Sequence, residues 1–263
     1  MTPRDAIVVV TGAASGIGRG LALRFAREGA AAIIAVDRDA SIGEVADRIH
    51  GLSLVADVGV EADVARIVAT TLDRYGRIDL FCSNAGIGGG DGSLETPDAD
   101  WQRTWQVNVM AHVYAARAVL PSMIAAGRGY LLHTASAAGL LMQVGSAPYT
   151  VTKHAAVGLA EWLSVTYGER GIKVSCLCPQ GVQTPMLESA PESIRELLGG
   201  GAVTPEAVAD AVMAGLADER FLILPHPEVR DYVQRKASDP DRWLRGMRRL
   251  QRELQQRTTK SLS

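Results

Sequence analysis

The sequence predicts an α/β fold, a doubly wound, seven-stranded parallel sheet with helices on both faces. Seven short runs are apolar almost without interruption, which is typical of parallel strands covered on both sides. Longer stretches with helical patterning separate these runs, so strands and helices alternate along the chain. No repeat or low-complexity linker divides the chain, which predicts one domain over residues 1–225 and a C-terminal helical extension over residues 226–263.

Each predicted strand is a β-rich run, and the seven runs span residues 6–10, 32–36, 52–56, 78–83, 130–134, 173–178 and 221–224. The helices predicted between them span residues 16–28, 41–49, 61–75, 98–126, 147–169 and 205–218. Thr204, a favourable N-cap residue, and Pro205, at the first helical position, mark the start of the last of these helices.

The composition is that of a folded protein with an uneven charge distribution. Of the 263 residues, 47% are hydrophobic and 27 are glycines without a strict period, which excludes disordered and collagen-like chains. The formal net charge is −2, from 27 Lys and Arg against 29 Asp and Glu. The extension carries ten basic and five acidic residues, so it is basic whereas residues 1–225 are acidic.

The cysteines, histidines and apolar runs exclude several classes of protein. Cys82, Cys176 and Cys178 lie in apolar runs without C-x-x-C spacing, which indicates buried, reduced thiols and a cytoplasmic location. No two histidines have the spacing of a metal-binding pair, so we expect no metal cofactor. No apolar run approaches the roughly 20 residues that span a bilayer, and the run after Met1 is too short for a signal-peptide core.

A glycine-rich loop, TGAASGIG at residues 11–18, joins the first predicted strand to the first helix. In such a loop Gly12 allows a tight turn, Gly16 lets the backbone approach a pyrophosphate, and Gly18 lets helix and strand pack closely. The free N–H groups and the positive dipole end of the helix favour an anion there. The loop therefore predicts a dinucleotide-binding site.

Asp37 ends the second predicted strand, where a carboxylate can accept hydrogen bonds from both hydroxyls of an adenosine ribose. The same negative charge would repel a 2′-phosphate, so the sequence favours NAD over NADP. Arg38 opposes this prediction in part, because a guanidinium at that position can pair with the phosphate.

Tyr149 and Lys153 have i, i+4 spacing on the predicted helix 147–169, so both side chains emerge on one face. An ammonium group near a phenol favours the phenolate, and we expect Lys153 to lower the pKa of Tyr149 and make it a usable acid/base. Ser136 follows the fifth predicted strand, at the sheet edge where ligands bind, and its hydroxyl can hold a substrate oxygen.

These and other motifs occur in one order along roughly residues 5–225: TGAASGIG (11–18), Asp37, Asp57-Val58, SNAG (83–86), Asn108, Ser136, YTVTK (149–153) and PQGVQT (179–184). In this order they resemble the short-chain dehydrogenase/reductase family, in its compact single-domain form. The resemblance implies a Rossmann-like fold and the transfer of a hydride between a nicotinamide dinucleotide and an alcohol or ketone.

The resemblance also implies a role for each matching residue. Tyr149 would be the general acid/base, Lys153 would bind the nicotinamide ribose, Ser136 would orient the reacting oxygen, and Asn108 would hold a water in a proton relay. The expected dinucleotide-binding residues are Gly12, Ser15, Gly16, Ile17, Gly18, Asp37, Arg38, Asp57, Val58, Asn84, Ala85, Gly86, Tyr149, Lys153, Pro179, Val182 and Thr184. The expected substrate-binding residues are Ser136, Gln143, Tyr149 and Gln180.

Two positions depart from the family's pattern. Ser83 stands where the family usually has Asn, and a hydroxyl there can still form local hydrogen bonds. Gln180 stands where Gly usually follows the proline, so its side chain can reach the substrate cavity and change the shape of that cavity.

Three segments after predicted strands, 86–94, 137–148 and 185–201, are expected to form the substrate pocket. Their apolar side chains are Leu140, Leu141, Met142, Met186, Leu187, Ile194 and Leu197. Arg195 is their single basic residue, so we expect an apolar, cyclic or steroid-like alcohol or ketone and not a strongly anionic substrate. The same side chains would also suit a flexible lid.

In the extension, Trp243, Met247, Leu250 and Leu254 recur at spacings of 4, 3 and 4, which predicts an amphipathic helix with arginines on its other faces. Such helices can bind membranes or nucleic acid. The acidic body favours packing on the same chain or on a neighbouring subunit, so we expect neither of these partners. The family resemblance implies a homotetramer or homodimer.

Together these observations predict an NAD-dependent oxidoreductase that interconverts a secondary alcohol and a ketone. The alternative within enzymes is an NADPH-dependent ketoreductase, such as a 3-oxoacyl-thioester reductase. The alternative from a different class is a non-catalytic dinucleotide-sensing protein, which would be expected to lose the Tyr149 and Lys153 pair.

Overall fold

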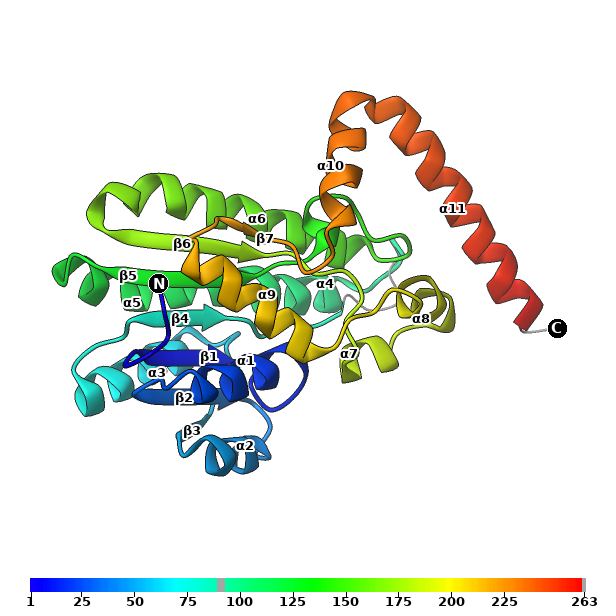
Figure 1. The fold of residues 1–263 in the computed structure, drawn as a ribbon. Helices are drawn as coiled ribbons and strands as arrows, with labels where there is room; N and C mark the ends of the chain where they lie inside the picture. The colour runs from blue at the N-terminus through cyan, green and yellow to red at the C-terminus, as the bar shows by residue number, and fades with distance from the viewer. Residues whose placement is uncertain (89–92, 262–263) are drawn as a thin grey trace.

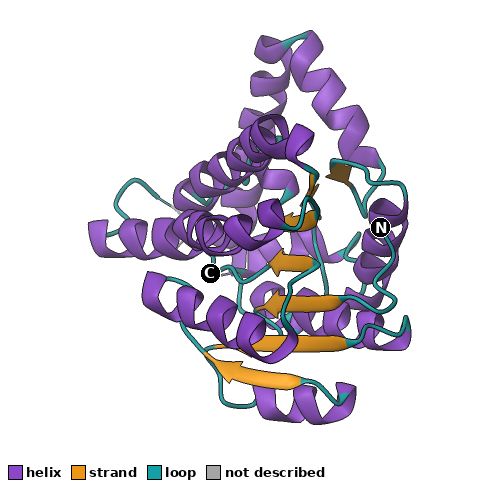
Figure 2. Cartoon of the chain, turned by 90° about the vertical axis from the view of Figure 1, so that its left-hand side faces the viewer, coloured by secondary structure: helices purple, strands orange, loops and turns teal. Residues whose placement is uncertain are grey.

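The fold is built on one parallel sheet. A computed structural model of the chain describes residues 1–88 and 93–261, and its sheet has the strand order β3-β2-β1-β4-β5-β6-β7. Figure 2 shows the strands as a row of arrows that point the same way, with helices on both sides, which confirms the predicted doubly wound sheet. The strands are β1 (Ile7–Thr11), β2 (Ala32–Asp37), β3 (Leu52–Val55), β4 (Leu80–Ser83), β5 (Gly129–Thr134), β6 (Ile172–Leu177) and β7 (Leu222–Ile223).

Two layers of helices cover the sheet (Figure 1). One face packs against α1 (Gly16–Arg27), α2 (Ile42–Ile49) and α9 (Pro205–Ala217). The other packs against α3 (Glu61–Tyr75), α5 (Ala111–Ala125) and α6 (Ala147–Tyr167). Successive strand residues point to opposite faces, so Val8 and Val10 join the first core and Val9 joins the second. Helices therefore shield both faces of the sheet from water, which explains why the strand sequences are almost uninterrupted apolar runs.

The remaining helices are short or lie beyond the sheet. They are α4 (Asp98–Trp105), the 3₁₀ turns Ala137–Gly139 and Gly168–Arg170, α7 (Pro185–Glu188), α8 (Glu192–Gly199), α10 (Glu228–Ser238) and α11 (Pro240–Ser261). Helices α10 and α11 pack on each other, α11 contacts α8, and the far end of α11 lies away from the sheet (Figure 1). Within residues 1–88 and 93–261, no helix has the length and apolar character needed to cross a membrane.

The structure corrects the prediction of one α-helix over residues 98–126. A π-helical turn, Gln106–Met110, separates α4 from α5. Its buried residue Asn108 forms hydrogen bonds to the backbone of Ile87, and these tertiary bonds accompany the wider turn. Single-turn π segments are common at functional sites, and a local change of this size leaves the helical periodicity of the sequence almost intact.

The strand order reverses between β1 and β4, which are neighbours in the sheet. β1 runs into α1 on one face, whereas β4 leads towards α4 and α5 on the other. At such a point the connections diverge and leave a crevice outside the carboxyl ends of the strands, where ligands bind in sheets of this type.

Candidate active site

A cavity of about 990 Å³ opens at the carboxyl ends of the strands. All of the residues expected to bind the dinucleotide line it, from the glycine loop to Val182 and Thr184, and so do the four expected to bind substrate. Asn108 is the one predicted site residue that does not line the cavity. The sequence motifs, although spread over the whole domain, thus meet in one place.

The glycine loop has a backbone that larger residues could not adopt. Gly12 and Gly16 have φ angles of +67° and +51°, in the left-handed region. A Cβ on Gly12 would lie 2.8 Å from the Cα of Ala85, and a Cβ on Gly18 would lie 2.0 Å from the carbonyl oxygen of Gly12. A Cβ on Gly16 would lie 2.9 Å from Cγ2 of Thr184, on the opposite wall of the cavity. The loop is therefore a cradle of the kind that holds a pyrophosphate against backbone N–H groups.

Thr11, for which the sequence analysis assigned no role, ties the loop to the next wall of the cavity. Its buried Oγ1 accepts hydrogen bonds from the backbone N–H groups of Asn84, at 2.9 Å, and Ala85, at 3.1 Å. The side chain of Asn84 in turn donates to the carbonyl of Thr11 at 2.9 Å and accepts from the hydroxyl of Thr134 at 3.0 Å. The ends of β1, β4 and β5 are thereby cross-linked. The only sequence signal for Thr11 is its place at the head of the loop motif.

Asp37 is fixed beside the glycine loop by two backbone groups. Its carboxylate accepts from the N–H of Ala14 at 3.0 Å and from the N–H of Asp39 at 3.1 Å. Arg38 lines the same part of the cavity. The acidic side chain is thus held at the position where the sequence predicts contact with an adenosine ribose.

Asp57 is also fixed by hydrogen bonds, and one of its partners, Arg103, is a residue to which the sequence motifs do not point. Its carboxylate accepts from the N–H of Gly59 at 2.8 Å and from Nη2 of Arg103 at 3.0 Å. Arg103 lies on α4 and lines the cavity. Forty-six residues separate this ion pair along the chain, and no local pattern marks it.

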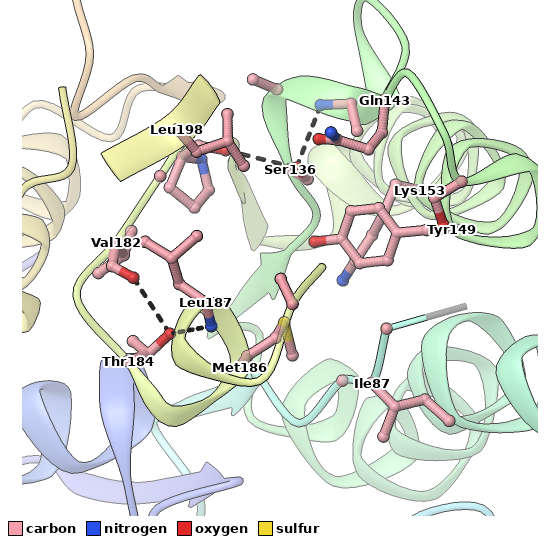
Figure 3. A pocket seen from close by; sticks show the side chains of 18 of the residues that line it. Ile87, Ser136, Gln143, Tyr149, Lys153, Val182, Thr184, Met186, Leu187 and Leu198 are labelled. Atoms are coloured by element: carbon pink, nitrogen blue, oxygen red, sulfur yellow. Dashed lines mark hydrogen bonds between the residues drawn. The ribbon is translucent and has the colours of Figure 1, made fainter. Parts of the chain in front are cut away.

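Ser136, Tyr149 and Lys153 lie together on one wall of the cavity (Figure 3). The hydroxyl of Ser136 accepts from the N–H of Ala138 at 3.1 Å, as the N-cap of the turn after β5. Nζ of Lys153 lies 5.6 Å from the centre of the Tyr149 ring and donates to the carbonyl of Thr134 at 3.1 Å. The i, i+4 spacing on α6 therefore brings the phenol and the amine together as predicted.

The pKa values of this group differ from the sequence-based expectation. Burial raises the pKa of Tyr149 above its ordinary value, and the hydrogen bond with Ser136 only partly opposes this. Burial also lowers the pKa of Lys153 to about 8. The prediction of a lowered pKa for Tyr149 is therefore wrong for this structure. The physical reason is that desolvation of the phenolate outweighs an amine that donates its hydrogen bond to Thr134.

Asn108 supports the site from behind. Its Oδ1 accepts from the N–H of Ile87 at 2.9 Å, and its Nδ2 donates to the carbonyl of Ile87 at 3.0 Å and to the hydroxyl of Thr152 at 3.2 Å. A Cβ on Gly86 would lie 3.3 Å from both Asn108 Oδ1 and Lys153 Nζ, so the three groups are closely packed. The side chain of Asn108 positions the segment after β4, and its role in a proton relay stays a prediction.

The expected substrate walls are only partly as predicted. Six of the seven apolar side chains line the cavity, but Leu140 packs instead against the buried cluster of Ala137, Leu141 and Val229. Arg195 does not line the cavity either, since its guanidinium donates to the carbonyl of Glu188 at 3.1 Å. Of the segment 86–94, residues 86–88 line the cavity and residues 89–92 lie outside the described residues.

The C-terminal extension supplies a further wall. Its lining residues are Tyr232, Arg235, Trp243, Met247 and Leu250. The apolar stripe predicted for the extension thus faces the cavity of the same chain. The sequence signalled the stripe but not what it covers.

Two hydrogen-bonded contacts fasten the extension to the catalytic wall. The ammonium of Lys236 donates to the carbonyls of Leu140 and Leu141 at 2.8 and 3.0 Å. The N–H of Gln180 donates to Nδ1 of the buried His226 at 3.2 Å. The start and the end of α10 are therefore tied to segments that line or adjoin the site.

The segment 185–201, which carries α7 and α8, is closed at its base. Val182 and Val203 form a parallel bridge, in which the N–H of Gln183 donates to Val203 at 2.9 Å and the N–H of Val203 donates to Gly181 at 3.1 Å. The hydroxyl of Thr184 then caps α7 (Figure 3). The loop of residues 185–201 thus lines the cavity, and the bridge between Val182 and Val203 fixes its two ends.

The sheet, its crevice and the glycine loop define a dinucleotide-binding α/β protein with a polar trio on one cavity wall. Residues 6–195 match the profile of the short chain dehydrogenase family. The chain therefore belongs to this family of oxidoreductases, whose members related to it act on hydroxy and keto groups.

Three similar proteins illustrate the relationship. The 1-deoxy-11-beta-hydroxypentalenate dehydrogenase of Streptomyces exfoliatus is 38% identical over 232 residues, which cover 84% of this chain and 83% of that protein. A short chain dehydrogenase/reductase from Burkholderia phymatum, solved in complex with NAD, has a TM-score of 0.84 and 27% identity over 92% of this chain and 96% of its own. A 7 alpha-hydroxysteroid dehydrogenase, solved with NADH and 7-oxo glycochenodeoxycholic acid, has a TM-score of 0.78 and 25% identity over 85% and 93% of the two chains.

Proposed function

We propose that this protein is an NAD-dependent oxidoreductase that interconverts a secondary alcohol and a ketone on an apolar, cyclic compound. The observation that carries this proposal is the trio of Ser136, Tyr149 and Lys153 on a cavity whose other end is the glycine loop. A non-catalytic sensor of dinucleotides would need the loop but would have no use for a buried phenol beside an amine.

The residues present fit a nicotinamide dinucleotide, because the glycine loop lines the cavity with backbone that Gly12 and Gly16 hold in the left-handed region. Its N–H groups would hold the pyrophosphate, Asp37 the adenosine ribose, and Val182 and Thr184 the nicotinamide end. When bound, the dinucleotide accepts or supplies the hydride. The anchored carboxylate of Asp37 supports NAD over NADP, and relatives solved with NAD and NADH support it further.

In this proposal the three polar residues divide the proton chemistry. The hydroxyl of Ser136 holds the substrate oxygen near the hydroxyl of Tyr149, whose Oη takes the proton of the alcohol or returns it to the ketone. Lys153 places its charge beside the Tyr149 ring and so stabilises the phenolate that must form. The side chain of Lys153 is only 3% exposed, and this low exposure to water strengthens the interaction.

The substrate class follows from the walls beyond this trio. Leu141, Met142, Met186 and Leu187 present apolar surface, and Gln143 is one of the few polar side chains among them. Such walls suit a compound whose bulk is hydrocarbon. The similar hydroxysteroid dehydrogenase supports a cyclic substrate.

The test is the variant Tyr149→Phe, assayed by nicotinamide absorbance on a panel of cyclic secondary alcohols and hydroxysteroids. We expect turnover to fall by about 10²-fold or more while NAD affinity stays within about threefold. Tyr167→Phe, at the end of the same helix and outside the cavity, is the matched control. Turnover that survives in Tyr149→Phe would show that another group is the acid/base, and a tenfold preference for NADPH would refute the cofactor assignment.

We further propose a cytoplasmic homodimer or homotetramer. Trp105 on α4 and Trp162 and Val165 on α6 are 42%, 56% and 85% exposed, which is apolar surface suited to contact between subunits. Three buried free thiols support a reducing compartment. Light scattering on the purified protein tests the assembly, and a monomer at micromolar concentration would contradict it.

A further inference from the structure

The charged side chains of the cavity are divided between its two ends. Among the described residues that line it, the charged ones are Asp37, Arg38, Asp57, Arg103, Lys153 and Arg235. The first four surround the end assigned to the adenosine, where Arg103 pairs with Asp57. Lys153 belongs to the catalytic trio. Arg235 is the charge that the proposed reaction does not use.

Arg235 lies on α10, close to the segment that follows Ser136, and lines the cavity there. Its neighbour Lys236 is bonded to the carbonyls of Leu140 and Leu141, which follow Ser136 along the chain. Its guanidinium stands 5.8 Å from the centre of the Tyr232 ring, and that ring lies 6.5 Å from Trp243. The hydrogen bonds of Lys236 fix this part of α10, and the Tyr232 ring lies beside the guanidinium of Arg235.

Arg235 forms no ion pair with the described acidic side chains. In the part of the chain that the structure describes, no acidic side chain lies within 4.0 Å of the guanidinium of Arg235. The residues of α11 that line the cavity, Trp243, Met247 and Leu250, are apolar. An unpaired guanidinium beside apolar surface is suited to a carboxylate, which it can bind through two parallel hydrogen bonds.

We propose that Arg235 binds a carboxylate of the substrate, so that the enzyme acts on apolar cyclic hydroxy acids in preference to neutral alcohols. The inference rests on the proposed function and names the substrate class for the same cavity. The hydrocarbon body lies against the walls built by α7, α8 and α11, with the hydroxyl at Ser136 and Tyr149 and the acid group at Arg235. The sequence disfavoured an anionic substrate because the three expected pocket segments contain Arg195 as their single basic residue. The C-terminal extension adds a second basic residue, Arg235, which lines the cavity.

The experiment compares matched pairs of substrates on the full-length enzyme. The probes are a hydroxycholanoic acid and a hydroxylated bicyclic terpenoid acid, each assayed beside its own methyl ester with NAD. We expect kcat/KM for the acid to exceed that for the ester by about tenfold, since the exposed guanidinium is only partly dehydrated. Arg235→Met should remove this preference, so that acid and ester are used about equally, whereas Arg235→Lys should keep part of it. Added salt should reduce the preference in the wild type.

Arg230→Met is the matched control, because it removes the same charge from the same helix at a position outside the cavity. Equal use of acid and ester, or a preference that survives Arg235→Met but not Arg230→Met, would overturn the inference while the proposed reaction stands. If neither probe is oxidised, calorimetric binding of each pair decides the question. Acid binding that depends on Arg235 then supports the carboxylate site although the proposed reaction fails, and equal affinity for acid and ester refutes it.

Discussion

Replacing Thr11 by Val should destabilise the protein and weaken dinucleotide binding together. Valine has nearly the shape of threonine but lacks the hydroxyl, and in the native structure that hydroxyl accepts from the N–H groups of Asn84 and Ala85. Thr11 itself is 3% exposed, so a water cannot readily take its place. The substitution therefore leaves two backbone donors without a partner at the edge of the cavity.

The magnitude follows from these two donors. A buried donor that loses its partner costs about 1–3 kcal/mol, and both groups here are only partly buried, which gives about 2–4 kcal/mol for the pair. For a chain of this length each kcal/mol lowers Tm by about 2–4 °C, so we expect a loss of about 5–15 °C. Because Asn84 and Ala85 line the cavity, NAD affinity should fall by about tenfold.

Thermal and urea unfolding at one protein concentration, with calorimetric NAD titration, measure both effects. Thr71→Val is the matched control, because its fully buried hydroxyl only donates to the carbonyl of Ile67, which is already part of a helix. That control should lose less than about 1 kcal/mol. Thr11→Ser, which keeps the hydroxyl, should retain most of the stability. If Thr11→Val and Thr71→Val are equally stable, the reasoning from unpaired donors is refuted.

Other substitutions should separate further features of the site. Gly18→Ala places a Cβ 2.0 Å from the Gly12 carbonyl oxygen and should abolish detectable NAD binding. The control Gly43→Ala, at an open helical position, should instead raise the free energy of unfolding by about 0.5–1 kcal/mol. Equal NAD binding by the two variants would contradict the assignment of the glycine loop as the dinucleotide site. Asp37→Ser removes the charge that repels a 2′-phosphate, so the ratio of kcat/KM for NADP to that for NAD should rise by about tenfold or more, and an unchanged ratio would count against the ribose assignment. Burial lowers the pKa of Lys153 from 10.5 to about 8, so between these pH values the unfolded chain binds more protons at this group than the folded chain. The stability of the wild type relative to Lys153→Met should therefore increase with pH over this range, and a difference in Tm that does not change with pH would show that the amine is not buried.

The sheet and the glycine loop could be predicted from the sequence because local rules determine them. Strands such as Ile7–Thr11 are apolar at every position but the last, since helices cover both faces, and this run of apolar residues distinguishes them from strands that face water. Gly12 and Gly18 are required by close contacts within or next to their own loop. The order of the motifs then placed Ser136, Tyr149 and Lys153 on one cavity wall.

What the sequence could not reveal depends on contacts between distant segments. Arg235 lies 99 residues from Ser136 along the chain, and nothing in its neighbourhood distinguishes it from the other arginines of the extension. Leu140 was expected in the pocket because it is apolar, but in the folded chain it packs against the buried cluster of Ala137, Leu141 and Val229 and does not line the cavity. The raised pKa of Tyr149 likewise depends on how deeply the ring is buried, which a spacing of four residues does not encode.

The bridge between Val182 and Val203 closes the loop of residues 185–201 at its two ends, so this loop can be exchanged as a unit. Its two ends meet at a hydrogen-bonded neck, so the entropy of closing the loop varies only slowly with the number of residues that it contains. A segment of different length or sequence can therefore be transplanted between these valines without moving Tyr149 or the glycine loop. Directed evolution of this enzyme towards new compounds should begin by exchanging residues 185–201 as one unit.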